Sequence, residues 1–82
     1  METLYSKQSE KFLGKLNAKT ALRVKSAINK LPEGDVKKLK GFASRYRLRV
    51  GDLRIEFSRG ENQIIVEKID FRGNSYMLGV VL

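Results

Sequence analysis

Four arginines lie between positions 45 and 54 and could together hold an anion. Arg45, Arg47 and Arg49 precede a Gly51-Asp52 pair, and Arg54 follows it. Apolar and charged residues alternate on both sides of this pair, which is typical of a half-buried β-hairpin. Guanidinium groups are always charged and can donate two parallel hydrogen bonds to a phosphate. The spacing therefore predicts a hairpin with one arginine-rich, anion-binding face.

The expected hairpin register places like charges opposite each other. In a two-residue hairpin the residues that flank the turn are paired, so counting outward puts Arg49 opposite Arg54. The next pair on this face is Arg47 and Glu56. Like charges directly across a ladder are destabilising. The pair of arginines therefore indicates that an anionic partner binds there.

Composition agrees with an anionic partner and excludes several kinds of site. The 82 residues carry a net charge of +8, and residues 36–59 hold eight basic residues against two acidic ones. The chain has no histidine and no cysteine, so histidine proton shuttles, thiolate metal sites and disulfides are excluded. The first residues do not resemble a signal peptide, and no apolar run could span a membrane. We expect a cytoplasmic protein without a membrane partner, a metal or another cofactor.

Periodicity predicts a single α+β domain over residues 1–82. The expected elements are a strand at 2–5, helices at about 7–16 and 18–31, a basic connector at 36–43, hairpin strands at about 45–50 and 53–59, a third long strand at 63–69, and a short apolar strand or tail at 76–82. Ser6 and Asn17 are expected to cap the two helices. In this fold the two helices pack on one face of a twisted, mostly antiparallel sheet. The arginine face of the hairpin then stays open.

The second predicted helix carries apolar and basic stripes. Its apolar stripe consists of Ala21, Val24, Ile28 and Leu31, widened by Leu22 and Ala27. Its basic residues lie off that stripe, and we expect them to form a solvated surface: Lys19, Arg23, Lys25 and Lys30.

Three motifs and the order of elements resemble the RelE/ParE superfamily of type II toxin–antitoxin toxins. They are the connector Leu31-Pro32-Glu33-Gly34-Asp35-Val36-Lys37-Lys38-Leu39-Lys40-Gly41, the hairpin Tyr46-Arg47-Leu48-Arg49-Val50-Gly51-Asp52-Leu53-Arg54-Ile55, and the end Ile69-Asp70-Phe71-Arg72-Gly73-Asn74-Ser75-Tyr76. The resemblance covers essentially the whole chain. It implies the RelE-like fold and a heteromeric complex with a cognate antitoxin that has an acidic or amphipathic segment.

In the ribonuclease branch of the superfamily, the toxin enters the ribosomal A site and cleaves mRNA without a metal. The ribose 2′-OH attacks the adjacent phosphate and leaves a cyclic phosphate and a 5′-OH. By this resemblance, Arg49, Arg54 and Arg72 form a phosphate clamp that stabilises the transition state. Tyr76 stacks on a base or donates its phenolic proton. Further RNA contacts are expected from the remaining basic residues of this region: Lys37, Lys38, Lys40, Arg45 and Arg47.

The site departs from some family nucleases in its proton acceptor. Those enzymes carry lysines where this chain has Arg47 and Arg49, and arginine is a poor general base because it stays protonated. Glu56 shares the open face and is the only nearby carboxylate that could accept the 2′-OH proton. The alternative is a simple ion pair of Glu56 with Arg47. We therefore expect weak or strictly ribosome-assisted cleavage.

Other interpretations of the same residues stay open at this stage. Arg54 and Arg72 could form surface salt bridges with Glu56 or Asp70, and Tyr76 could be a half-buried strand aromatic. The basic connector could be solvated. At the level of function, the alternatives are a ParE-like toxin that poisons gyrase without nuclease activity and a non-catalytic RNA-binding domain.

Overall fold

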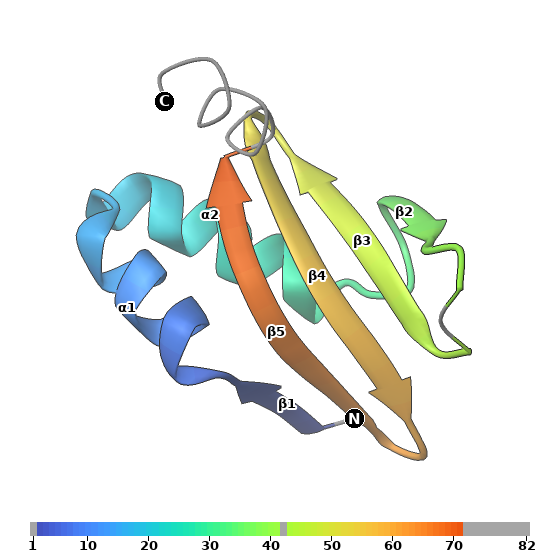
Figure 1. Ribbon diagram of the computed structural model, residues 1–82. Coiled ribbons are helices and arrows are strands. Elements are labelled where there is room, and N and C mark those ends of the chain that lie inside the picture. Colours follow the sequence, from blue (N-terminus) through green and yellow to red (C-terminus); the bar gives the residue numbers. More distant parts are fainter. Residues whose placement is uncertain (1, 42, 72–82) are drawn as a thin grey trace, which may run out of the picture.

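A computed structural model of the chain describes residues 2–41 and 43–71 (Figure 1). The elements are β1 (Glu2–Tyr5), α1 (Lys7–Lys15), α2 (Ala18–Asn29), β2 (Asp35–Lys38), β3 (Arg45–Val50), β4 (Leu53–Gly60) and β5 (Gln63–Phe71). The five strands form one sheet in the order β1-β5-β4-β3-β2, and both helices cover the same face. The pair β1–β5 is parallel and the other three pairs are antiparallel. The predicted fold class is confirmed.

The core lies between the helices and the sheet because the strands alternate in polarity. Leu48 of β3 and both Ile55 and Phe57 of β4 are almost fully buried on the helix side. Val24 and Ile28 of α2 pack against them and are equally buried. The intervening strand residues therefore point away from the helices, onto the open face that the alternation predicts.

Both helix starts are capped as the sequence predicts. The Ser6 hydroxyl accepts the N–H of Ser9 at 3.1 Å, and the Asn17 side-chain oxygen accepts the N–H of Thr20 at 2.8 Å. These bonds satisfy backbone donors that lack a partner in the first turn of a helix. The caps fix where α1 and α2 begin, right after β1 and right after α1.

A side chain of α1 continues the sheet edge where β1 stops. The side-chain amide of Gln8 donates to the carbonyl of Ile69 at 2.8 Å and accepts the N–H of the same residue at 3.0 Å. The pair of bonds imitates a strand partner for β5, whose backbone would otherwise be unpaired here. It anchors α1 to the strand that leads toward the predicted site.

Two expectations about the elements were wrong. Residues 36–43 were expected to form a basic connector, but residues 36–38 belong to the edge strand β2 (Asp35–Lys38), which pairs with β3. Only Val36 of this strand packs on the core, so the sequence shows no alternation of apolar residues. Leu22 was expected to widen the core stripe of α2, but it is 67% exposed because α2 contacts the sheet through a narrower face. The predicted element at 76–82 lies outside the described residues.

Within the ranges 2–41 and 43–71, no helix is long and apolar enough to cross a membrane.

Candidate functional site

The hairpin register is the predicted one. Arg49 pairs with Arg54, and Arg47 pairs with Glu56, on the face of the sheet that the helices leave open. The residues beside the turn, Val50 and Leu53, are also partners. The sheet therefore holds two guanidinium groups side by side on neighbouring strands.

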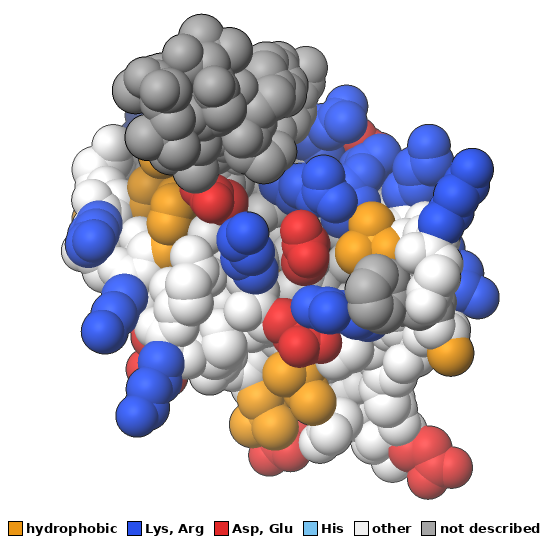
Figure 2. Space-filling model, in the orientation of Figure 1, with side chains coloured by type: hydrophobic (Ala, Val, Ile, Leu, Met, Phe, Trp, Pro, Cys, Tyr) orange, Lys and Arg blue, Asp and Glu red, His pale blue; other side chains and the backbone are white. Residues whose placement is uncertain are grey.

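The neighbouring strands extend these pairs into two rows of charge across the open face. The first charged row is Asp35 of β2, Arg49, Arg54 and Asp70 of β5. The second charged row is Lys37 of β2, Arg47, Glu56 and Lys68 of β5. Figure 2 shows basic side chains gathered over β2, β3 and β4, with acidic side chains beside them. The sheet thus brackets the central arginine pair with a carboxylate on each side.

The two rows hold five basic and three acidic residues, a net charge of +2. This face is less positive than residues 36–59 suggest, because Asp35 and Asp70 come from outside that segment. The positive charge of this segment is therefore partly compensated by Asp35 and Asp70, which neighbouring strands place beside it.

A bulge in β5 brings Asp70 onto this face. The register shifts between Glu56 and Phe57, so that Phe57 pairs with Val66 but Glu56 pairs with Lys68. The extra residue of β5 is Glu67. Because side chains alternate between the two faces of a strand, Asp70 would face the core if this extra residue were absent. The spacing of three between the buried residues Val66 and Ile69 is the signal in the sequence that could have revealed the bulge.

Asp35 contacts two of the three arginines of β3, Arg47 and Arg49. Its carboxylate lies 3.4 Å from Nη1 of Arg47 and 4.0 Å from Nε of Arg49. Its backbone carbonyl also accepts a hydrogen bond from Arg47 Nη1 at 3.2 Å. The side chain of Arg47 is only 14% exposed, whereas that of Arg49 is 40% exposed. Of the two arginines that Asp35 contacts, Arg49 is therefore the one more available to a ligand.

Glu56 forms an ion pair with Arg54, the arginine on its own strand, rather than with Arg47. The distance from Glu56 Oε2 to Arg54 Nε is 3.4 Å. The contact lacks hydrogen-bond geometry, and the buried Nε of Arg54 has no hydrogen-bond partner within the described residues. The side chain of Arg54 is 41% exposed, so the rest of its guanidinium is open to solvent. The carboxylate proposed as a proton acceptor and an arginine of the proposed clamp are thus in direct contact.

The other predicted RNA contacts lie farther from the central pair. Lys37, Lys38 and Lys40 are exposed on or just after the edge strand β2. Arg45 lies 3.4 Å from the carboxylate of Glu67, the bulge residue. Arg72 and Tyr76 lie outside the described residues. The strand that precedes them ends at Phe71, which pairs with Leu53 at the same end of the sheet as the first charged row.

No metal cluster is formed by the described residues. Within them, no three histidine, cysteine, aspartate or glutamate side chains gather in a way that could hold a metal ion.

Burial raises the pKa of the Tyr5 phenol on β1, two strands away from the arginine pair. This titration is therefore separate from the charged rows.

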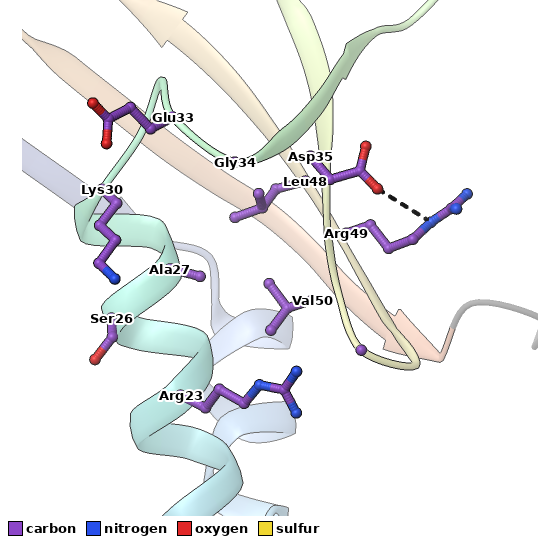
Figure 3. A pocket seen from close by; sticks show the side chains of 11 residues that line it. Arg23, Ser26, Ala27, Lys30, Glu33, Gly34, Asp35, Leu48, Arg49 and Val50 are labelled. Atoms are coloured by element: carbon purple, nitrogen blue, oxygen red, sulfur yellow. Dashed lines mark ion pairs between the residues drawn. The ribbon is translucent and has the colours of Figure 1, made fainter.

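A cavity of about 480 Å³ adjoins the first charged row at the β3–β4 turn (Figure 3). Its lining residues are Arg23, Ser26, Ala27, Lys30, Glu33, Gly34, Asp35, Leu48, Arg49, Val50 and Gly51. Arg49 belongs both to this cavity and to the first charged row. Arg23 is exposed, as expected, and its guanidinium lies near Gly51 of the turn. The position of Arg23 on the helix did not indicate this proximity, because α2 and the turn are distant parts of the chain.

Solved structures support the resemblance that the motifs indicate. No protein-family model and no curated protein sequence matches this chain. A chain of the RelB–RelE antitoxin–toxin complex from Methanococcus jannaschii superposes with a TM-score of 0.74 and 27% identity, covering 92% of this chain and 96% of that chain. A chain of the archaeal RelE–RelB complex from Pyrococcus horikoshii OT3 gives a TM-score of 0.73 and 26% identity, covering 89% and 96%. The predicted similarity to the RelE/ParE superfamily is thus confirmed, and the protein is RelE-like in its fold and along nearly its whole chain.

Proposed function

We propose that this protein is the toxin of a type II toxin–antitoxin system and that it cleaves mRNA on the ribosome without a metal. The observation that carries the proposal is the pair Arg49 and Arg54, held side by side on an open sheet face of a RelE-like fold. Two opposed guanidinium groups repel each other, and the carboxylates beside them compensate this repulsion only in part, so an anion bound between them is favoured. A phosphodiester of single-stranded RNA provides that anion.

The arginine pair would act on the charge that develops during cleavage. When the ribose 2′-oxygen attacks the phosphorus, negative charge builds up on the phosphorane oxygens, and fixed cations stabilise it more than they stabilise the ground state. One well-placed contact of this kind is worth about 2.7–4 kcal/mol. Arg49 and Arg54 are the donors in this proposal. Arg72 completes the clamp by its match to the family motif.

Glu56 is the proposed proton acceptor. A phosphate bound by Arg54 would compete with Glu56 for the same guanidinium, which lies 3.4 Å away in the free protein. The released carboxylate would take the proton of the 2′-OH as the O2′–P bond forms. The P–O5′ bond then breaks, and the departing 5′-oxygen takes a proton from Tyr76 or from a water ordered by the ribosome. The role of Tyr76 is carried over from the motif alone.

A cognate antitoxin is the proposed protein partner. The similar archaeal chains were both crystallised as complexes of RelE with RelB. The open face and the exposed lysines of β2 carry excess positive charge, which an acidic segment would complement. We therefore propose a heteromeric complex in which the antitoxin covers this face.

Regulated expression in bacteria combined with primer extension on translated mRNA tests the proposed function. We expect growth arrest and cuts inside reading frames, in phase with codons, and the loss of both in Arg54→Ala. Arg59→Ala is the matched control, because Arg59 is exposed near the other end of the same strand. An SOS response without cuts would instead support a gyrase poison. Normal growth with intact mRNA would rule out both toxins.

A further inference from the structure

Arg23 has no part in the proposed clamp, yet it lies close to it. Its guanidinium atoms come within 3.5–3.8 Å of the position that a Cβ on Gly51 would occupy. Figure 3 shows Arg23 on one side of the β3–β4 turn and Arg49 on the other. The two side chains come from α2 and β3, so only the tertiary fold brings them to the same turn.

Within the described residues, no acidic residue holds the Arg23 side chain in place. Neither this side chain nor that of Lys30 in the same cavity makes a hydrogen bond or an ion pair there, whereas Arg49 and Arg54 each contact a carboxylate. The carboxylate of Asp35 turns toward Arg49, on the side of β3 away from α2. Glu33 also lines the cavity but makes no ion pair with either cation, so this part of the cavity has a net positive charge.

Gly51 keeps the turn open beside this charge. Its φ of +58° lies in the left-handed region that favours glycine, and it has no side chain to cover the Arg23 guanidinium. The apolar part of the lining consists of Ala27 of α2 and of Leu48 and Val50 of β3. The cavity therefore offers a cation next to an apolar surface.

We propose that Arg23 binds the phosphate of the RNA strand next to the one held by Arg49 and Arg54. This inference rests on the proposed function, because it requires RNA on the open face. Arg49 lines both sites, and Gly51 lies two residues beyond it, in the turn that follows β3. An RNA strand bound at the arginine pair therefore continues over the turn and carries its next phosphate to Arg23, with its ribose against the apolar part of the lining.

The salt dependence of RNA binding tests this contact directly. Each phosphate contact with single-stranded nucleic acid contributes about 0.7 to the slope of log K against log salt. For a short single-stranded RNA measured by fluorescence anisotropy, we expect Arg23→Gln to make the slope shallower by about this amount. The matched control is Lys25→Gln, which removes the same charge from the same helix but lines a different cavity, near β1 and α1. It should leave the slope unchanged.

The outcomes separate this inference from the proposed function. If wild-type protein cuts mRNA but Arg23→Gln binds RNA like Lys25→Gln, Arg23 makes no phosphate contact and the inference is overturned. If wild-type protein does not cut mRNA, the cleavage proposal fails, and an NMR titration with the same RNA still decides the contact: a shift of the Arg23 Nε–H signal supports it, and no shift overturns it. A shift with a glutamate-rich peptide but not with RNA would make the cavity an acidic-peptide site and also overturn the inference.

Discussion

Asp35 restrains Arg47 and Arg49 of β3, and Asp35→Asn should loosen this restraint. The carboxylate contacts Arg47 at 3.4 Å and Arg49 at 4.0 Å, and it is itself 56% exposed. Asparagine keeps nearly the same shape but removes the charge. A phosphate that binds Arg49 then no longer has a carboxylate beside it.

The magnitude follows from the exposure of the pair. Ion pairs exposed to this degree stabilise a fold by about 0.2–1 kcal/mol, so the free energy of unfolding should fall by less than about 1 kcal/mol. If a phosphate bound to Arg49 lies about 4 Å from the Asp35 carboxylate, these two negative charges repel each other by about 1 kcal/mol in a water-like environment. Relief of that repulsion should tighten RNA binding about fivefold at low salt. The variant is therefore expected to lose a little stability and to gain affinity for RNA.

Fluorescence anisotropy with a short single-stranded RNA, at low and at physiological salt, measures this gain. Glu61→Gln is the matched control, because Glu61 is an exposed acid on the β4–β5 turn, far along the strand from the arginine pair. It changes the net charge equally and should have a much smaller effect. If both variants bound RNA more tightly by the same factor, the gain would come from the change in net charge and not from the contact of Asp35 with Arg49. Weaker binding by Asp35→Asn would show that the carboxylate positions Arg49 for RNA, and the repulsion argument would be refuted.

Three further predictions concern the site, the sheet edge and alkaline stability. Glu56→Gln should lower the single-turnover rate of cleavage much more than it lowers RNA binding, because it removes the proposed proton acceptor but leaves Arg49 and Arg54 in place. Gln8→Ala should lower the free energy of unfolding in urea by about 1–3 kcal/mol, since it leaves the N–H and the carbonyl of Ile69 without their partner. Burial raises the pKa of Tyr5 above its ordinary 10.0, so the neutral phenol favours the folded state. Stability from this group is present below about pH 10 and is lost as pH rises through the folded pKa, and Tyr5→Phe should lessen this loss in thermal melts.

Each of these predictions has its own control and its own contrary result. Equal losses of binding and cleavage in Glu56→Gln would make Glu56 a partner of Arg54 and not a base. The control for Gln8→Ala is Lys7→Ala, which changes an exposed neighbouring residue. It should change the free energy of unfolding by no more than about 0.5 kcal/mol. If it lowered stability as much as Gln8→Ala, the effect would come from the start of the helix and not from the bonds to Ile69. An unchanged alkaline loss in Tyr5→Phe would assign it to other groups.

The hairpin and its paired arginines could be predicted because their causes are local. A period of two fixes which side chains share a face, and the Gly-Asp turn fixes which residues are opposite each other. Both helix caps were equally local, since each needs only a side chain and an N–H three residues later. The pairs Arg49–Arg54 and Arg47–Glu56 follow from the sequence for this reason.

The partners of these arginines could not be predicted in the same way. Asp35 reaches Arg49 because β2 pairs with β3, and only one residue of that short strand faces the core, so the apolar pattern does not reveal the strand. Asp70 lies beside Arg54 only because the bulge at Glu67 shifts the register of β5 by one residue. Both contacts depend on the pairing of strands that are distant in sequence or irregular.

The sequence by itself determined that this protein has a basic hairpin on an α+β fold and that two arginines face each other across it. The tertiary structure decided how much of that positive charge is compensated by nearby carboxylates. It set carboxylates from β2, β4 and β5 against the arginines of the open face, and it carried Arg23 from α2 to the turn. The physical reason is that side-chain periodicity is a property of a short segment. Charge compensation depends on distances through space, and those exist only after the distant strands and the helix have packed together.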